Sequence, residues 1–375
     1  MGQKYIYFSG TVLGSYRAQN MIKSSSDLGC DMCHISPRFF LFDCKIGHLR
    51  PILKAAAHII FFPIKLYLIS RSHYLILLPM NFSWACMLDV FIARIFQKQI
   101  MVDFYISMFD TLVNDRGMVN SQSATGKILF FKDRFLLQSA TKVFFLNQAE
   151  SDYYTSIVNI TLPAEKICII PLCIDPKNTI SSKFSLGTKN RMTICWWGTY
   201  IPLHGLDKII EAIGLLKDEP IELILIGDSD VKAEPFRHLV RKLDLENKIE
   251  IRNDLRFSDG TLGPFLENNC DLALGNFGDS VKAKTVLVNK VVDALAMGLA
   301  CLTFKTKGAA EFLEDGKDIF FSEATPVAIA NKIKTIFNNK KSIDTVGIGA
   351  LQTYHHHFSQ DAFRTRLHGA LNQLR

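Results

Sequence analysis

Three polar side chains recur at intervals of four residues near the start of a predicted helix. They are Thr285, Asn289 and Asp293, in the stretch KAKTVLVNKVVDALAMG that spans residues 282–298. This spacing places them on one side of a helix. Phosphates bind at helix N-termini because the free backbone N–H groups, here around Val286, and the helix dipole favour negative charge. The stretch is a candidate clamp for a phosphate or a nucleotide sugar, and a solvated helix face is the alternative.

The elements that follow indicate the sheet that would position this helix. Gly298 suits a helix end, since a residue without a Cβ adopts the left-handed conformation easily, and the apolar residues 300–304 are typical of a buried strand. Helix, tight turn and strand are the units of a doubly wound α/β sheet, in which ligands bind beyond the carboxyl ends of the strands. We therefore expect other strand ends to carry functional residues.

Two strand ends in the first half of the chain carry such residues. The predicted strand 5–9 leads into GTVLGSYRAQN, where Gly14 and Arg17 are candidate contacts for a phosphate or sugar. Only two glycines are present there, so a plain turn between strand and helix is the alternative. The predicted strand 99–104 carries Asp103 at its carboxyl end and is followed by Tyr105, and both residues are candidates for catalysis.

Length and composition indicate a globular protein of two domains. The chain has 375 residues, of which 48% are apolar and 21% charged, and one ordinary core would not accommodate it.

Nine cysteines are scattered along the chain, and Cys30 and Cys33 lack the second pair or nearby histidines that would complete a zinc site. Reduced thiols in a cytosolic protein are the expectation, and the short apolar run after Lys4 predicts no signal peptide.

The positive charge is concentrated in the first half. Residues 1–180 contain 18 lysines and arginines against 12 acidic residues, whereas residues 181–375 contain 25 against 24. A basic half suits an anionic partner, which could be nucleic acid, a phospholipid surface or a phosphorylated lipid. No nucleic-acid-binding motif accompanies the charge, so nucleic acid is not expected as a partner.

An apolar stretch with basic residues on one side points to the membrane surface. In PILKAAAHIIFFPIKLYLIS, residues 51–70, a helix would align Lys54, His58 and Lys65, and Pro63 would disturb its middle. The stretch is interrupted by charge too often for the ~20 apolar residues that a bilayer span needs. It is either a core helix or a helix in the membrane interface with its basic residues at the headgroups, and the sequence favours the second.

A repeated strand–helix series divides the chain. We expect a first domain over residues 1–180, a second over 190–355, a polar linker at 176–191 between them, and a C-terminal helix, 358–375, that packs back on the first domain. Asp228-Ser229-Asp230 follows a predicted strand and favours a turn over a metal site, and the three histidines at 355–357 favour a polar turn.

Four segments in order resemble glycosyltransferase family 4, whose members have the two-domain GT-B fold. KDRFLLQSATKVFFLNQAESDYY and EKICIIPLCID are similar to the family's pattern in its first domain. GTYIPLHG is similar to the family's GRLSPEKG, and Thr285 with Asp293, followed by ALAMGLACLT and GAAEFLEDG, is similar to its Glu-x7-Glu stretch. The resemblance implies an α/β protein with two Rossmann-like doubly wound domains that face each other across a cleft.

The resemblance also implies residues that bind the donor. The family's first Glu, which contacts the transferred hexose, corresponds to Thr285, and its second, which contacts the ribose, corresponds to Asp293. The Arg and Lys that hold the diphosphate after the glycine at Gly198 correspond to Thr199 and His204.

Other lysines nearby could replace the family's Arg and Lys, which are absent at positions 199 and 204. Lys282, Lys284 and Lys290, together with N–H groups from Val286 to Asn289, could hold the diphosphate instead. In the first domain, Tyr105 falls where many members have a histidine near the reacting centre. Catalytic candidates are therefore Asp103, Tyr105 and His204.

The activity implied is a hexosyltransferase that moves a sugar from a nucleotide diphosphate sugar with retention at the anomeric carbon. The resemblance implies no cofactor and no metal. We expect a saccharide or lipid-linked saccharide acceptor, as in synthesis of bacterial surface polysaccharide or lipopolysaccharide. We also expect a cytoplasmic location with peripheral contact at the anionic inner face of the cytoplasmic membrane. The alternatives are an inverting transferase or epimerase on the same fold, and a catalytically silent sugar-nucleotide-binding partner.

Overall fold

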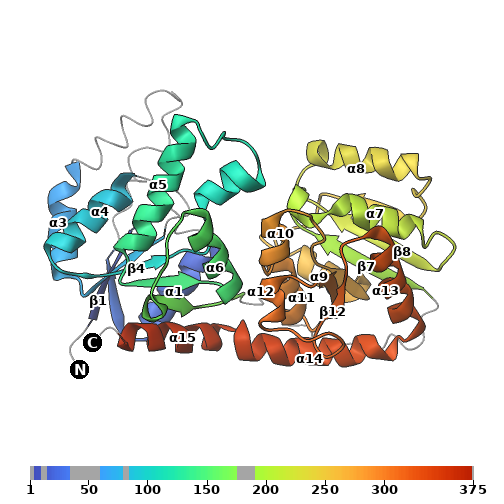
Figure 1. The fold of residues 1–375 in the computed structure, drawn as a ribbon. Coiled ribbons are helices and arrows are strands. Elements are labelled where there is room, and N and C mark those ends of the chain that lie inside the picture. The colour runs from blue at the N-terminus through green and yellow to red at the C-terminus, as the bar shows by residue number, and fades with distance from the viewer. Residues whose placement is uncertain (1–3, 10–14, 34–59, 79–83, 175–190, 374–375) are drawn as a thin grey trace. The chain divides into compact units, whose positions relative to one another are not determined.

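Two parallel sheets organise the chain in the computed structural model, each within its own compact unit (Figure 1). The structure describes residues 4–9, 15–33, 60–78, 84–174 and 191–373. The first unit comprises Met1–Pro171 together with Phe363–Arg375, and the second comprises Leu172–Ala362. The linker predicted at 176–191, Gly14 and the predicted helix residues Lys54 and His58 lie outside the described residues, apart from Arg191 at the linker's end.

The first sheet has the strand order β2-β1-β3-β4-β5-β6, all parallel. Its strands are β1 (Lys4–Ser9), β2 (Cys30–Cys33), β3 (Tyr74–Leu77), β4 (Gln99–Asp103), β5 (Lys142–Phe145) and β6 (Ile167–Ile169). The helices of this unit are α1 (Tyr16–Asp27), α3 (Phe62–Arg71), α4 (Trp84–Ile95), α5 (Ala124–Ser139), α6 (Gln148–Ile157) and most of α15 (Gln360–Asn372), with a π-helix at Asp110–Asp115. The strands predicted at 5–9 and 99–104 are confirmed, as β1 and β4.

The end of α15 is bonded to the first unit. The Tyr74 hydroxyl donates to the carbonyl oxygen of Leu371 at 3.4 Å, and Lys142 Nζ donates to Gln373 Oε1 at 3.1 Å. Phe363 is buried, with the Arg17 guanidinium 5.1 Å above its ring. These contacts, far apart in the sequence, explain why residues after Ala362 group with the first unit.

The second sheet has the order β12-β11-β10-β7-β8-β9, again all parallel. Its strands are β7 (Met192–Trp197), β8 (Ile221–Ile226), β9 (Ile249–Arg252), β10 (Leu272–Leu274), β11 (Cys301–Phe304) and β12 (Phe320–Ser322). Its helices include α7 (Leu206–Gly214), α8 (Asp230–Lys242), α9 (Leu262–Asn269), α10 (Val281–Thr285), α11 (Asn289–Ala296), α12 (Lys307–Ala310), α13 (Pro326–Asn338) and α14 (Lys341–His357). The strand order reverses between β7 and β10, which is where ligands bind in doubly wound sheets.

Alternation along β7 supplies two separate cores. Trp196 packs in a cluster with Ile209 of α7 and Ile333 of α13. The next residue, Trp197, packs in a different cluster with Val292 of α11. Side chains of successive strand residues point to opposite faces, so both faces of the sheet are buried under helices. The prediction of doubly wound α/β domains is confirmed.

The stretch predicted as one long helix from Thr285 is two helices. α10 ends at Thr285, the backbone is extended at Val286 and Val288, and α11 begins at Asn289. Thr285 is therefore not on the same helix as Asn289 and Asp293, and the predicted stripe of three is wrong at its first member. Gly298 has φ +64 just beyond the end of α11, as predicted for a helix end.

The histidines at 355–357 form the last turn of α14, so the predicted polar turn is wrong. Val346, Ala350 and Tyr354 recur every four residues and are buried, and α14 packs on α11 through this region. Burial of that apolar face continues the helix through a polar sequence.

The membrane-facing helix predicted at 51–70 is also different in the structure. α3 begins at Phe62 and holds Pro63 in its first turn, where the missing N–H breaks no helical hydrogen bond. Lys65 is 2% exposed and pairs with Asp89 at 2.9 Å, and Asp89 also accepts from the Ser9 hydroxyl. The expectation that Lys65 faces lipid headgroups is therefore wrong, because its charge is used inside the unit. Within the described parts of the chain, the helices are too short or too polar to cross a bilayer.

Candidate active site

Two loops meet where the order of the second sheet reverses. The loop after β7 contains His204, whose carbonyl oxygen accepts from the N–H of Phe277 in the loop after β10 at 3.0 Å. The N–H of Gly278 donates to Leu203 at 3.2 Å. Gly205 has φ +60, and a Cβ there would lie 2.5 Å from the Phe277 carbonyl oxygen, so only glycine allows this approach. The two loops are thus fixed to each other at the predicted ligand edge.

A buried lysine from α11 reaches the histidine of this loop. Lys290 Nζ lies 3.0 Å from His204 Nδ1 and 4.4 Å above the ring of Trp196. Lys290 is 5% exposed and His204 8% exposed. A Cβ on Gly198, which has φ +144, would lie 3.2 Å from Lys290 Nζ. Lys290 makes no ion pair with the part of the chain that the structure describes, so its charge is not neutralised by direct contact with a carboxylate.

Burial sets the protonation of this pair. It lowers the pKa of Lys290 well below the usual range, while Asp293 and Cys301 act in the opposite direction. Burial also lowers the pKa of His204 to about 2, and the charge of Lys290 acts in the same direction. His204 is therefore a neutral imidazole at neutral pH, not the protonated phosphate donor that is the strongest form of histidine.

Asp293 lies on the same helix with a tryptophan as its partner. Trp197 Nε1 donates to Asp293 Oδ2 at 3.1 Å. Burial raises the pKa of Asp293 to about 7, and the Trp197 hydrogen bond and Lys290 act against this shift. The two tryptophans that end β7 thus serve different groups, since Trp196 supports Lys290 and His204 and Trp197 supports Asp293.

The other predicted donor contacts in the second unit have varied positions. Thr285 is buried, and its hydroxyl donates to the carbonyl oxygen of Val281 at 2.8 Å. Val286 is also buried, whereas Thr199, Lys284 and Asn289 are exposed. The structure therefore brings together Gly198, His204, Lys290 and Asp293 around the end of β7, and Thr285 has its hydroxyl turned to its own helix.

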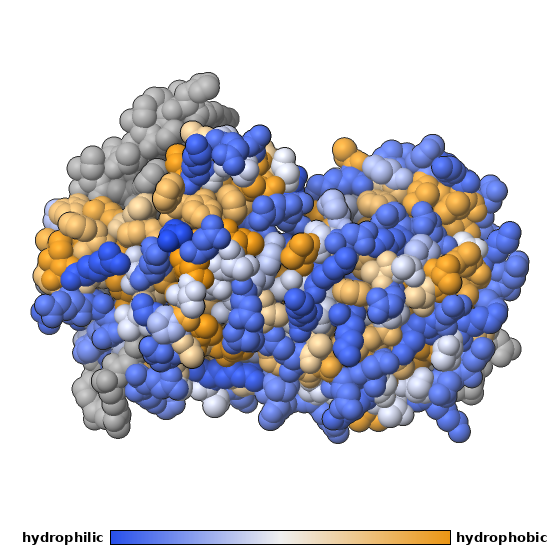
Figure 2. All heavy atoms as spheres, in the orientation of Figure 1, coloured by the Kyte–Doolittle hydropathy of each residue, from blue (hydrophilic) through white to orange (hydrophobic). Residues whose placement is uncertain are grey.

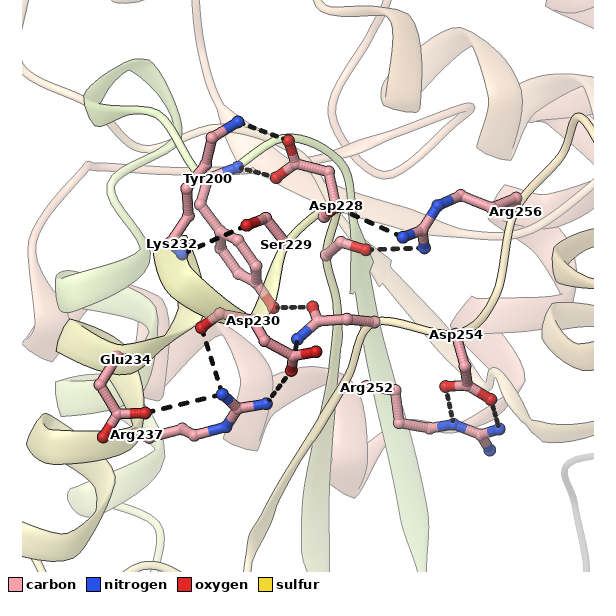
Figure 3. Close-up of polar contacts among 12 residues, drawn as sticks. Tyr200, Asp228, Ser229, Asp230, Lys232, Glu234, Arg237, Arg252, Asp254 and Arg256 are labelled. Atoms are coloured by element: carbon pink, nitrogen blue, oxygen red, sulfur yellow. Dashed lines mark hydrogen bonds and ion pairs between the residues drawn. The ribbon is translucent and has the colours of Figure 1, made fainter.

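A polar network holds the loop that follows Gly198 (Figure 3). The backbone N–H of Tyr200 donates to Asp228 Oδ1 at 3.2 Å, and Lys232 Nζ donates to Asp228 Oδ2 at 2.6 Å. The Tyr200 hydroxyl donates to Asn253 Oδ1 at 2.9 Å, and Arg256 Nη1 donates to the Gly227 carbonyl oxygen at 3.0 Å. These contacts fix the path of residues 198–200 from the ends of β8 and β9.

The Asp228-Ser229-Asp230 segment is part of this network (Figure 3). Asp230 accepts from Arg237 Nη2 and from Asn253 Nδ2, and Ser229 caps α8. The segment is a turn between strand and helix, as predicted. Among the described residues there is no group of three or more His, Cys, Asp or Glu side chains placed to hold a metal ion.

Two predicted site residues of the first unit, Arg17 and Asp103, meet at the carboxyl end of β4. Arg17 binds both oxygens of Asp103 through Nε at 3.0 Å and one of them through Nη2 at 2.7 Å. Arg17 Nη1 also donates to the carbonyl oxygens of Ile170 and Pro171 at 2.8 and 2.7 Å. Arg17 is 4% exposed and Asp103 fully buried. Donor contact by Arg17 stays a prediction, and its guanidinium joins β4 to the chain after β6.

Burial at this position raises the pKa values of both Asp103 and Tyr105. Burial raises the pKa of the Asp103 carboxyl, and Arg17 acts to lower it. Burial, then the charge of Asp103, raises the pKa of Tyr105 to about 12, against a hydrogen bond to Ser15. The Tyr105 hydroxyl is therefore neutral at physiological pH and is only partly buried, so it can still donate a hydrogen bond to a ligand.

Residue-by-residue reasoning missed the supporting side chains. Trp196 and Trp197 are not among the predicted site residues, although a pair of aromatic residues directly before Gly198 is a local signal that could have found them. The contact of His204 with the Phe277 loop has no local signal, because the two are distant in sequence.

One comparison with known proteins finds a family model that matches part of the second unit. Residues 191–339 match the family model described as glycosyl transferases group 1, which covers less than half of the chain. A comparison with curated proteins gave no significant match. The matched range includes both loops at the reversal between β7 and β10 and the whole of α11.

Solved structures resemble the entire chain at low sequence identity. HepE from Anabaena, in complex with UDP and glucose, has a TM-score of 0.67 and 14% identity, covering 99% of this chain and 100% of that one. A glycosyltransferase from Rickettsia africae has a TM-score of 0.70 and 16% identity, and covers 100% of both chains. The lipopolysaccharide outer core galactosyltransferase WaaB has a TM-score of 0.66 and 10% identity, also covering 100% of both. These neighbours show that the chain has the GT-B fold, and residues 191–339 match the model for group 1 glycosyl transferases.

Proposed function

We propose that this protein transfers a sugar from a nucleotide diphosphate sugar to a saccharide or lipid-linked saccharide, with retention at the anomeric carbon. The observation that carries the proposal is the cluster of Gly198, His204, Lys290 and Asp293 at the reversal of a parallel sheet, inside the range that matches group 1 glycosyltransferases. The proposal includes no metal and no cofactor, and the family resemblance supports that part.

The cluster suits the charge that develops when a diphosphate departs. A diphosphate leaving group gains negative charge in the transition state, and fixed donors and cations stabilise it. Lys290 supplies a buried cation without a paired carboxylate among the described residues, and the N-terminus of α11 at Asn289 supplies backbone N–H groups. Asp293 is placed on the same helix to accept hydrogen bonds from ribose hydroxyls.

Retention follows if the acceptor attacks from the face that the nucleotide leaves. This route requires no nucleophile from the protein, only donors that hold the departing diphosphate next to the acceptor hydroxyl. The acceptor is assigned to the first unit, where Tyr105 offers a neutral hydroxyl beside Asp103 at the carboxyl end of β4. NMR assignment of the anomeric configuration of the product tests this step, and an inverted product would exclude it.

A direct assay separates the transferase from a silent nucleotide-sugar binder, which the buried Thr285 in place of the family's Glu would favour. A panel of nucleotide sugars is screened first for thermal stabilisation, since a ligand at 100 times its Kd stabilises the folded form by about 2.7 kcal/mol. The best ligand is then assayed for hydrolysis or transfer. We expect activity that His204→Ala or Asp293→Ala abolishes without unfolding; binding without any turnover would support the silent binder.

The membrane part of the proposal uses a different region. Apolar side chains on the outside of α3 and α4 are exposed, among them Ile64 at 49%, Tyr67 at 58%, Phe91 at 63% and Ile95 at 58%. The spacing within each helix puts them on one side of it, and Figure 2 shows hydrophobic surface over these two helices. We propose that this face contacts the anionic inner surface of the cytoplasmic membrane, where a lipid-linked acceptor would be presented.

Vesicle sedimentation tests the membrane contact. Ile64→Glu combined with Phe91→Glu should abolish binding to vesicles that contain anionic phospholipid, because each change puts a charge into the proposed apolar contact. Val327→Glu, at an equally exposed position of α13 in the other unit, is the matched control and should bind like the unmodified protein. Equal sedimentation of all three proteins would remove the membrane contact and leave the sugar transfer untouched.

A further inference from the structure

The two nitrogens of the His204 ring have different surroundings. Nδ1 lies 3.0 Å from Lys290 Nζ, and this is the hydrogen bond that the ring makes to other described residues. The imidazole and the Trp196 indole form a T-shaped pair, with centroids 5.4 Å apart and planes at 65°. The same indole lies beneath Lys290 Nζ at 4.4 Å. One tryptophan therefore holds both members of the pair in place.

The chemistry of the pair decides which nitrogen carries the proton. When Lys290 is an ammonium it has three donors and no acceptor, so Nδ1 accepts from it with its lone pair. Against the effect of burial, Asp293 and Cys301 act to keep Lys290 in this form. A neutral imidazole carries one N–H, and the hydrogen bond at one nitrogen determines where it lies. Burial and the charge of Lys290 both keep the His204 ring neutral by lowering its pKa. The proton is then on Nε2.

We propose that Lys290 is a positioning residue that fixes His204 in the Nε2–H tautomer, so that a neutral histidine donates a hydrogen bond to the diphosphate of the nucleotide sugar. This inference rests on the proposed function for the identity of the ligand. It assigns Lys290 a role through His204, whereas the sequence suggested a direct phosphate contact. The buried position of Lys290 agrees with an indirect role, since its Nζ has the ring of His204 and the face of Trp196 around it.

The neighbouring groups restrict how the pair can be tested by pH. Lys290 also interacts with Asp293 on α11 and with Cys301 on β11. Burial raises the pKa of the Cys301 thiol, which keeps it neutral, but it raises the pKa of Asp293 to about 7. An Asp293→Asn background removes the second titration from any measurement on His204.

The tautomer is measured first, by ¹⁵N NMR of the histidine side chains in the ligand-free protein. We expect His204 to show a protonated Nε2 and an unprotonated Nδ1 from pH 8 to pH 5.5. In Lys290→Met we expect a mixture of tautomers that titrates nearer the usual histidine range. The inference is overturned if Nδ1 of the unmodified protein carries the proton, or if Lys290→Met leaves the His204 signals unchanged. This measurement needs no nucleotide sugar, so its result is valid even if the proposed function is wrong.

Binding is measured second, with UDP as the probe, in Asp293→Asn and in Asp293→Asn/Lys290→Met. At each pH the affinity of Asp293→Asn is divided by that of Asp293→Asn/Lys290→Met. Ionisation of UDP affects both affinities equally, so it cancels in this ratio. We expect a ratio of about ten at pH 8, where the double variant loses one oriented donor. The ratio should fall as the pH is lowered to 5.5, because a protonated His204 donates from both nitrogens.

The controls separate this role from simple packing or charge. Lys217→Met removes an exposed lysine of the same unit. Added to Asp293→Asn in place of Lys290→Met, it should leave the UDP affinity unchanged, so that the ratio is one at every pH. Lys290→Arg keeps a donor opposite Nδ1 and should restore part of the affinity and the single tautomer. A loss of affinity of equal size at pH 5.5 and pH 8 would indicate that Lys290 acts by packing or charge alone, and would contradict the inference.

Discussion

Arg17 and Lys290 are both buried cations at carboxyl edges of parallel sheets, but their partners differ. Arg17 in the first unit binds the Asp103 carboxylate and two backbone carbonyl oxygens. Lys290 in the second unit contacts a neutral imidazole and an aromatic face, and no ion pair is found for it in the described parts of the chain. The first charge is neutralised within the fold, whereas the second has no carboxylate partner among the described residues and orients a histidine instead.

This difference predicts opposite consequences for stability and ligand binding. Removing one member of a buried, paired charge leaves the other without compensation, which is strongly destabilising. Removing an unpaired buried cation relieves a desolvation cost instead. Removal of the structural cation should therefore lower the stability of its unit, whereas removal of the positioning cation should lower the affinity for a ligand.

The largest effect is expected from Asp103→Ala, which leaves the Arg17 guanidinium buried without its carboxylate. We expect a loss of about 3–5 kcal/mol in the free energy of opening of the first unit. Hydrogen exchange of peptides from α1 and β4 measures this unit separately from the other. Asp27→Ala is the control, because Asp27 pairs with Arg364 at 3.9 Å on the surface, where ion pairs contribute little. A loss no greater than the control's would contradict the structural role of the Arg17–Asp103 pair.

Gly198→Ala tests the space around Lys290. The new Cβ would lie 3.2 Å from Lys290 Nζ and 3.3 Å from its Cε, at a backbone φ of +144 that suits glycine. We expect UDP affinity to fall about tenfold, equal to ~1.4 kcal/mol, as the ammonium is displaced from His204. Isothermal titration calorimetry measures it.

Gly316→Ala is the matched control for that substitution. Gly316 has φ +77 with nothing near its Cβ, so it carries the backbone strain without the contact. We expect lower thermal stability but unchanged UDP affinity in this variant. Equal affinities for the two alanine variants would show that the position of Lys290 does not matter for the ligand.

Lys290→Met should change stability in the direction opposite to Asp103→Ala. Because the folded protein lowers the pKa of Lys290, the charged form is disfavoured in the folded state, and its removal raises stability at pH values below the usual lysine range. We expect the free energy of unfolding of the second unit to rise by about 1 kcal/mol, or to stay unchanged. Urea unfolding followed by tryptophan fluorescence measures it. A loss of several kcal/mol would show that Lys290 is structural like Arg17.

The smallest effect concerns the pH dependence that Asp293 contributes. Its pKa in the folded protein is raised to about 7, so the folded state takes up a proton as the pH falls through 7 and the unfolded state does so only near pH 4. Stability should therefore rise as the pH falls from 8 towards 5, and this part of the rise should be absent in Asp293→Asn. Thermal unfolding at half-unit pH steps measures the difference, and identical profiles for the two proteins would contradict the shift.

The amino-acid sequence by itself determined the elements and their class. Alternating apolar strands and helices with glycines at their ends predicted two doubly wound units, and Gly198, His204 and Asp293 were found from local spacing and motif resemblance. The same local reasoning placed Lys65 at a surface and Thr285 on the helix of Asp293, and both were wrong. Charge and periodicity show what a segment could do alone, but not which partner from another segment will cover it.

Only the tertiary structure decided the partners. Lys65 is neutralised by Asp89, Arg17 by Asp103, and Lys290 meets His204 across 86 residues of sequence. Whether a buried cation is neutralised or serves another side chain depends on whether a carboxylate from a distant segment reaches it, because a buried charge is strongly affected by its immediate contacts. Strand order brings those segments together, and no local pattern in the chain specifies that order.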